Sequence, residues 1–196
     1  SNQRTASGRL VTASRPPAYE AIYNPRYPIS AYAMAAARHM HEYGTTREQL
    51  ADVAVAARAW AQHNPEAFER GPLTREDVLG ARMVGDPLTV RDCCLVTDGG
   101  GAIVMVRAER AKDFPKAPVY VLGSAAQSSH RQISQMKDFT VTAAREFGQR
   151  AYAAAGVSAK DIQAVELYDA FTINTILFLE DLGFCAKGEG GAFVEG

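Results

Sequence analysis

The stretch Val165–Cys185, VELYDAFTINTILFLEDLGFC, decides the fold because it joins a predicted strand to a predicted helix. The strand, Ala164–Tyr168, is short, mostly apolar and bounded by polar residues. Behind it, apolar residues recur at the spacing of one helix face, and Gly183 supplies a stop. These predicted core contacts are Ile173, Ile176, Leu177 and Phe184. The pair Tyr168 and Asp169 therefore stands at the corner between strand and helix.

This polar corner has two interpretations. In open α/β sheets, ligands bind at the carboxyl ends of parallel strands, which is where Tyr168 and Asp169 fall. In a purely structural interpretation, Asp169 or Thr172 caps the helix and Tyr168 is a boundary aromatic residue. Spacing alone leaves both interpretations open.

The first 90 residues are predicted to be mostly helical after a proline-rich lead-in over residues 1 to about 30. Alanine-rich composition and cap signals define the segments. We predict a helix over 30–43 that stops at Gly44, a helix over 45–64 with Thr45 and Glu48 at capping-box spacing, and shorter helices over 65–70 and after Thr74.

The second half alternates between strand and helix patterns. Short apolar runs predict strands at Ala102–Val106, from Val119, and at Ala164–Tyr168. Helices are predicted over 107–114, over 140–155 with a stop at Gly156, and at a short turn where Ser158 and Asp161 have cap spacing. This alternation predicts parallel pairing and an α/β layer architecture.

Composition narrows the functional classes. The chain has 196 residues, 47% of them hydrophobic, which is enough for a packed core. A net charge of −1 without a basic block argues against a nucleic-acid partner. No apolar run approaches the roughly 20 residues that span a bilayer. We therefore predict a cytoplasmic protein with no membrane or nucleic-acid partner and with three reduced cysteines.

Other candidate sites have weaker support. The glycine-rich stretch Asp98–Gly101 precedes a strand, unlike a phosphate-binding loop, which opens a helix. No thiolate-stabilising neighbour is evident near Cys93–Cys94, so we interpret these cysteines as structural. His39 and His41 are two apart on a helix and cannot chelate together, and no metal site is predicted. His130, in a polar loop, is the only histidine placed like a site residue.

Several stretches resemble the thiolase superfamily, specifically sterol-carrier-protein-type thiolases and the related actinobacterial lipid-transfer-protein enzymes. They are YDAFT with its following helix and LGFCAKGEGGAFVEG, RDCC running into TDGGGAIVMV, and MHEYGTTREQLADVAV. The resemblance implies part of a layered α/β/α/β/α fold with a mostly helical inserted loop domain. It assigns residues 1–92 to a lead-in arm and the loop domain, 93–115 to the last strand and helix of the N-terminal half, and 116–196 to the start of the C-terminal half.

The resemblance also implies catalytic roles. Tyr168 stands where such thiolases have the histidine of a His-Asp-x-Phe motif, which helps to hold an oxyanion formed from a thioester or ketone. A tyrosine hydroxyl can donate the same hydrogen bond. Members with tyrosine here include aldolases that cleave steroid side-chain coenzyme A thioesters. The candidate catalytic residues are therefore Tyr168 and, as a support that orients the turn, Asp169.

We accordingly expect an enzyme that makes or breaks a carbon–carbon bond next to a coenzyme A thioester. Thiolase-type acyl transfer on a 3-ketoacyl-CoA is the leading hypothesis. There are two alternatives. One is retro-aldol cleavage, and the other is a non-catalytic scaffold that docks a small acyl-CoA-binding subunit. Coenzyme A enters as substrate and no covalent cofactor is expected. None of Cys93, Cys94 and Cys185 matches a thiolase catalytic cysteine, so the segment alone is expected to be inactive, and the parent enzyme to be a homodimer.

Overall fold

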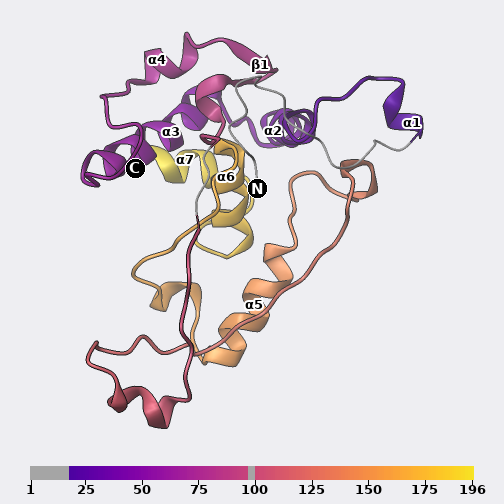
Figure 1. Ribbon diagram of the computed structural model, residues 1–196. Helices are drawn as coiled ribbons and strands as arrows, with labels where there is room; N and C mark the ends of the chain where they lie inside the picture. Colours follow the sequence, from indigo (N-terminus) through magenta and orange to yellow (C-terminus); the bar gives the residue numbers. More distant parts are fainter. Residues whose placement is uncertain (1–17, 97–99) are drawn as a thin grey trace.

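The computed structural model describes residues 18–96 and 100–196 (Figure 1). The start of the lead-in, residues 1–17, and part of the glycine-rich stretch, residues 97–99, lie outside the described residues. The α-helices are α1 (Ala18–Ala21), α2 (Ile29–Tyr43), α3 (Arg47–Gln62), α4 (Arg75–Leu79), α5 (Ala144–Ala155), α6 (Thr172–Asp181) and α7 (Gly190–Glu195). The strands are β1 (Met83–Gly85) and β2 (Leu88–Thr89), and the 3-10 helices are η1 (Val90–Asp92), η2 (Ala108–Asp113), η3 (Ile133–Gln135) and η4 (Ala159–Asp161).

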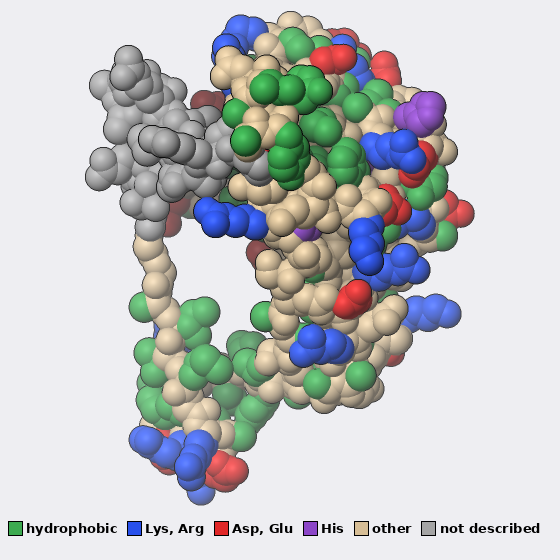
Figure 2. All heavy atoms as spheres, turned by 90° about the vertical axis from the view of Figure 1, so that its right-hand side faces the viewer, with side chains coloured by type: hydrophobic (Ala, Val, Ile, Leu, Met, Phe, Trp, Pro, Cys, Tyr) green, Lys and Arg blue, Asp and Glu red, His purple; other side chains and the backbone are tan. Residues whose placement is uncertain are grey.

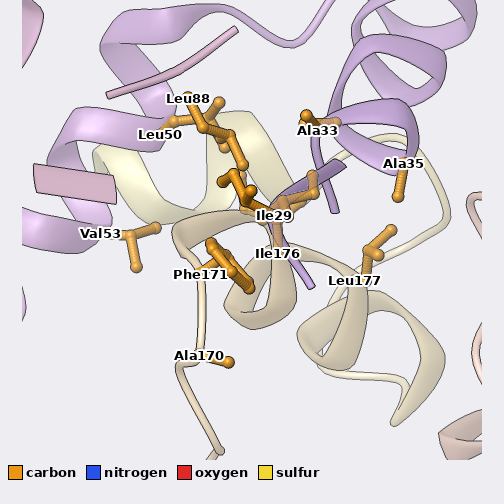
Figure 3. Packing of buried hydrophobic residues seen from close by; sticks show 12 residues of the cluster. Ile29, Ala33, Ala35, Leu50, Val53, Leu88, Ala170, Phe171, Ile176 and Leu177 are labelled. Atoms are coloured by element: carbon orange, nitrogen blue, oxygen red, sulfur yellow. The ribbon is translucent and has the colours of Figure 1, made fainter. Parts of the chain in front are cut away.

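Helix α6 is the centre of the packed body, with α2, α3, α5 and α7 in contact with it. Its predicted core residues Ile173 and Ile176 are fully buried, and Leu177 is 4% exposed. Figure 3 shows the Phe171 ring directed into the same cluster as Ile29 and Leu50. Each such side chain contributes about 1.5–3 kcal/mol through burial. The apolar face predicted from the opening stretch is thus confirmed as the core, although Phe184 is only partly buried.

The helix ends agree in part with their sequence signals. Gly44 and Gly156 adopt the predicted left-handed conformation, with φ of 75° and 70°. Thr74 caps α4 as expected, with Asp77 completing a capping box, and the expected pair Ser158–Asp161 also forms a capping box.

Two predictions in this region are wrong. The second long helix is capped by Thr46 with Gln49, not by Thr45 with Glu48. Thr45 is buried, and its hydroxyl hydrogen-bonds the His39 ring at 2.7 Å, so a tertiary contact takes the side chain away from the cap. The expected short helix over 65–70 is a single turn followed by irregular chain.

The three predicted strands are also wrong for the described residues, where the only sheet is the antiparallel β1–β2 pair. Residues 102–106, 119–122 and 164–168 run as irregular segments (Figure 1). A strand is held by hydrogen bonds from a neighbouring strand, and the described chain brings none to these runs. Their side chains are open to solvent, with Ile103 90% and Val119 95% exposed. Figure 2 shows hydrophobic side chains gathered on an arm that projects from the body.

These open segments predict that the chain of residues 1–196 self-associates. Unpaired backbone next to apolar side chains is a template for pairing with another chain. Light scattering coupled to size-exclusion chromatography is expected to report species heavier than the 21.1 kDa chain. A stable, monodisperse 21.1 kDa monomer would contradict this prediction.

Candidate functional site

The corner before α6 is built without a side-chain cap. The N-cap residue is Phe171, whose backbone is extended and whose side chain makes no cap hydrogen bond. The interpretation of Asp169 or Thr172 as the cap is therefore wrong. Thr172 instead donates from its hydroxyl to Asp92 Oδ1 at 2.8 Å, because Asp92 is buried against the first turn of the helix.

Backbone contacts join this corner to the RDCC stretch. The Cys94 amide donates to the Ala170 carbonyl at 3.0 Å, and Cys93 pairs with Phe171 in an isolated antiparallel bridge. Two stretches far apart in sequence, both used for the family resemblance, therefore lie side by side. The site residues on either side of this contact are fixed by backbone geometry.

Asp92 is a site-supporting residue that the sequence reasoning missed. Its Oδ2 accepts from the Thr89 amide at 2.7 Å and from the Thr89 hydroxyl at 2.8 Å, while Oδ1 accepts from Thr172. The carboxylate thus clamps η1 to α6. The available signal was the capping-box spacing from Thr89 to Asp92.

A cavity of about 210 Å³ lies beside this junction. Its walls come from α3, from residues 90–95 and from Asp169 and Thr172. Asp169 therefore lines the cavity, whereas Tyr168 does not and is 71% exposed. Arg58 also lines it, with its guanidinium donating to the Gly71 carbonyl at 2.9 Å. The arrangement combines an apolar helix face with two thiols, with the carboxylates of Glu69, Asp92 and Asp169, and with the guanidinium groups of Arg58 and Arg91.

The thiols at this cavity are poor nucleophiles. Burial, followed by the negative charge of Asp92, raises the pKa of Cys93 to about 11. Burial and the charge of Asp169 raise the pKa of Cys94. Burial, with the charge of Glu180 next, likewise raises the pKa of Cys185 to about 11. Because the thiolate is the reactive form, these values support the structural interpretation of the cysteines.

The charge of Asp169 predicts a specific change in thiol reactivity. Asp169→Asn removes a negative charge that disfavours the Cys94 thiolate, so iodoacetamide at pH 8.5 is expected to modify Cys94 about two to three times faster. Peptide mapping by mass spectrometry measures the rate. Cys185, which senses other carboxylates, serves as the internal control and is expected to be unchanged. An equal rate for Cys94 in both proteins would contradict an influence of the Asp169 charge on this thiol.

A second polar cluster lies at the other end of α6. His39 is fully buried, and its Nε2 lies 3.0 Å from both Glu180 carboxylate oxygens. Because a carboxylate only accepts, Nε2 carries the hydrogen. Glu180 also accepts from the Gly190 amide at 2.9 Å and pairs with Lys187 Nζ at 3.0 Å, while the same Nζ lies 2.7 Å from Asp181 Oδ1. The sequence excluded His39 as half of a metal-binding pair with His41, and the structure places it in the core.

His130 lines a different and larger cavity, together with α2, α5 and α6. Its Nδ1 lies 2.8 Å from Ser129 Oγ. Within residues 18–96 and 100–196, no three His, Cys, Asp or Glu side chains are grouped so as to hold a metal ion. Over the same ranges, every helix is too short or too polar to cross a bilayer.

Comparisons with known proteins identify relatives of this arrangement. Residues 125–196 match the family described as "Thiolase C-terminal domain-like". An acetyl-CoA acetyltransferase of Methanothermobacter thermautotrophicus is 43% identical over 180 residues, which is 91% of this chain and 47% of the relative. A steroid side-chain-cleaving aldolase of Thermomonospora curvata is 42% identical over 173 residues, 85% of this chain and 44% of the relative.

A solved structure titled "Ltp2-ChsH2(DUF35) aldolase" is 36% identical and superposes with a TM-score of 0.83 over 94% of this chain and 52% of that chain. Because the superposition covers 94% of this chain, it includes most of the irregular segments. The architecture is therefore that of part of a thiolase-like aldolase chain. The chain spans about half the length of the curated relatives named above.

Proposed function

Because this chain is homologous to enzymes of the thiolase superfamily, we propose that its parent protein makes or breaks a carbon–carbon bond next to a coenzyme A thioester. The observation that carries the proposal is the similarity over 85–91% of the chain to both an acetyltransferase and an aldolase of this kind. That similarity spans the Tyr168–Asp169 corner and the RDCC stretch, which backbone contacts hold together.

Tyr168 is the proposed donor to the oxyanion. Its hydroxyl group lies on a side chain that is 71% exposed, so a substrate can approach it. In thiolase-type cleavage, the thiol of coenzyme A adds to the 3-keto carbon and the carbon–carbon bond breaks to give two thioesters. In this reaction, as in the retro-aldol cleavage described next, the thioester carbonyl carries negative charge as an enolate. A hydrogen bond from the Tyr168 phenol stabilises that charge.

Retro-aldol cleavage is the second candidate, and tyrosine in place of histidine favours it. There the 3-hydroxyl loses its proton, its carbon becomes a carbonyl, and the bond electrons pass to the thioester enolate, which is then protonated. This reaction uses no second thiol. Because the pKa values of Cys93 and Cys185 are raised to about 11, these two thiols stay protonated near neutral pH and are not nucleophiles. This agrees with a chain that is inactive by itself.

We further propose the division into a loop domain over 1–92, the end of an N-terminal half over 93–115 and the start of a C-terminal half over 116–196. Exposed apolar segments at 102–106 and 119–122 support pairing with strands of the rest of the parent protein. A homodimer, a small acyl-CoA-binding partner subunit and a cytoplasmic location belong to the same proposal. The partner is supported by the two-component name of the matched aldolase, and the location by three free cysteines.

The scaffold hypothesis is tested by titrating coenzyme A into the chain of residues 1–196 and measuring heat by calorimetry. If the loop domain and the corner contribute to the coenzyme A site, saturable binding is expected. Absence of binding, with the chain folded by circular dichroism, favours a scaffold that docks a partner.

A further inference from the structure

Two surface segments border the cavity that His130 lines, which has a volume of about 540 Å³. One is the arm of residues 18–28, which carries α1 and contributes Tyr27 and Pro28 to the wall. The other is the loop of residues 127–136, which carries η3. The rest of the wall comes largely from α2, α5 and α6. The arm and the loop are far apart in sequence and meet at the right of Figure 1.

A cluster of side chains around Glu20 joins the arm to the loop. The Glu20 carboxylate accepts one hydrogen bond from Tyr27 Oη, within the arm, and one from Ser134 Oγ, in the loop. Tyr19 Oη lies 2.8 Å from Ser134 Oγ. Because the single hydrogen of the Ser134 hydroxyl goes to the carboxylate, which only accepts, Tyr19 is the donor in this second bond. Over the described residues, the hydrogen bonds between arm and loop are these two, and both run through Ser134.

Apolar burial contributes little to holding the arm in place. Of residues 18–28, only Glu20 is buried. The Ile22 and Tyr23 side chains of the arm are 77% and 81% exposed. The loop likewise buries one side chain, that of Ile133. Segments with few buried apolar contacts and exposed hydrogen bonds open at a lower free energy than a packed core, so the arm and the loop can separate while the helices behind them stay folded.

We propose that the arm and the loop form a lid over this cavity, and that Glu20 and Ser134 are the latch that holds the lid closed. Breaking the two bonds of Ser134 frees the arm from the loop and opens the cavity to a small molecule from solution. The volume, and a wall that includes the rings of Phe139, Phe147 and Phe178, suit a small apolar ligand. This role does not depend on which reaction the parent protein catalyses.

A cysteine placed inside the cavity measures how readily the lid opens. Ala35 lies on α2, lines the cavity and is 5% exposed, so the thiol of Ala35→Cys is expected to react slowly with iodoacetamide. Adding Glu20→Leu or Ser134→Ala is expected to raise this rate about tenfold, because the loss of one or two hydrogen bonds shifts the opening equilibrium by about that factor. Peptide mapping by mass spectrometry measures the rate. Ala144→Cys, at a cavity residue that is 1% exposed, is a second reporter.

Two controls separate opening of the lid from loss of the fold. Tyr23→Phe changes an exposed tyrosine of the same arm and is expected to leave the Ala35→Cys rate unchanged. Ala36→Cys places a thiol on the same helix at a fully buried position outside the cavity wall, and its rate is expected not to respond to Glu20→Leu.

The lid is contradicted if neither Glu20→Leu nor Ser134→Ala changes the rate of Ala35→Cys. It is also contradicted if the rate of Ala36→Cys rises as much as that of Ala35→Cys, because the bonds of Glu20 then hold the whole fold and not a lid. These labelling rates need no turnover, so a failure here is distinct from a failure of the parent enzyme to cleave CoA thioesters.

Discussion

Tyr168→Phe in the parent enzyme is expected to lower kcat by a factor of about 100 to 1,000, with a smaller change in KM. Removing one donor from an oxyanion site has an effect of this size, because the hydrogen bond strengthens as charge develops. The ring is retained and the side chain is 71% exposed, so folding is expected to be unaffected. Steady-state kinetics on a 3-ketoacyl-CoA or 3-hydroxyacyl-CoA substrate measure the effect.

The matched control is Tyr23→Phe, which removes the hydroxyl of a tyrosine that is 81% exposed and far from α6 in sequence. It is expected to leave kcat unchanged. Near-wild-type kcat in Tyr168→Phe would remove Tyr168 from the mechanism, whatever the reaction class.

The second large effect, on stability, is expected at the buried cluster of His39 and Glu180 at the other end of α6. Glu180→Leu leaves His39 Nε2 and the Gly190 amide without their acceptor, and it removes one of the two carboxylates that pair with the Lys187 ammonium. Breaking a buried pair by removing one partner costs about 3–5 kcal/mol. Urea unfolding of the chain is expected to show this loss as a lower midpoint. Glu42→Leu, which breaks the surface pair with Arg38, is the control and is expected to cost about 0–1 kcal/mol.

The same cluster gives a pH dependence. Burial by itself raises the pKa of Glu180, but hydrogen bonding and charge from His39, with Lys187 and the Gly190 amide, lower it overall from its ordinary value of 4.5. A lowered pKa in the folded state means stability that is present above pH 4.5 and is lost as the pH falls through the folded-state pKa. In Glu180→Leu this loss is expected to be smaller. Equal losses of unfolding free energy in Glu180→Leu and Glu42→Leu, measured by urea unfolding, would contradict the buried cluster.

Local signals predicted the helices, and long-range contacts account for most of the failures. The alanine-rich run ending at Gly44 and the apolar face with Ile173 and Ile176 depend on neighbours within a few residues, so their patterns were sufficient. The cap shifted from Thr45 to Thr46 because His39, on another helix, holds the Thr45 hydroxyl. Nothing local to either residue contains that information.

The strands failed for a related reason. Val119 and Ile103 belong to runs with good strand composition, but a strand exists only when another segment supplies hydrogen bonds. At the candidate site, the sequence located the Tyr168–Asp169 corner by its place before α6. It could not show that Asp92 would clamp that corner through Thr172, because the two residues are distant in sequence.

The most direct test of the central claim is product analysis on the parent enzyme. Purified protein is incubated with 3-ketoacyl-CoA and 3-hydroxyacyl-CoA thioesters, with and without added coenzyme A, and the products are separated by liquid chromatography with mass detection. Carbon–carbon cleavage is expected to give a shortened product and a second fragment. Dependence on added coenzyme A indicates thiolysis, and independence indicates retro-aldol cleavage. Intact thioesters under both conditions, from a folded parent protein with its partner subunit present, would contradict the account.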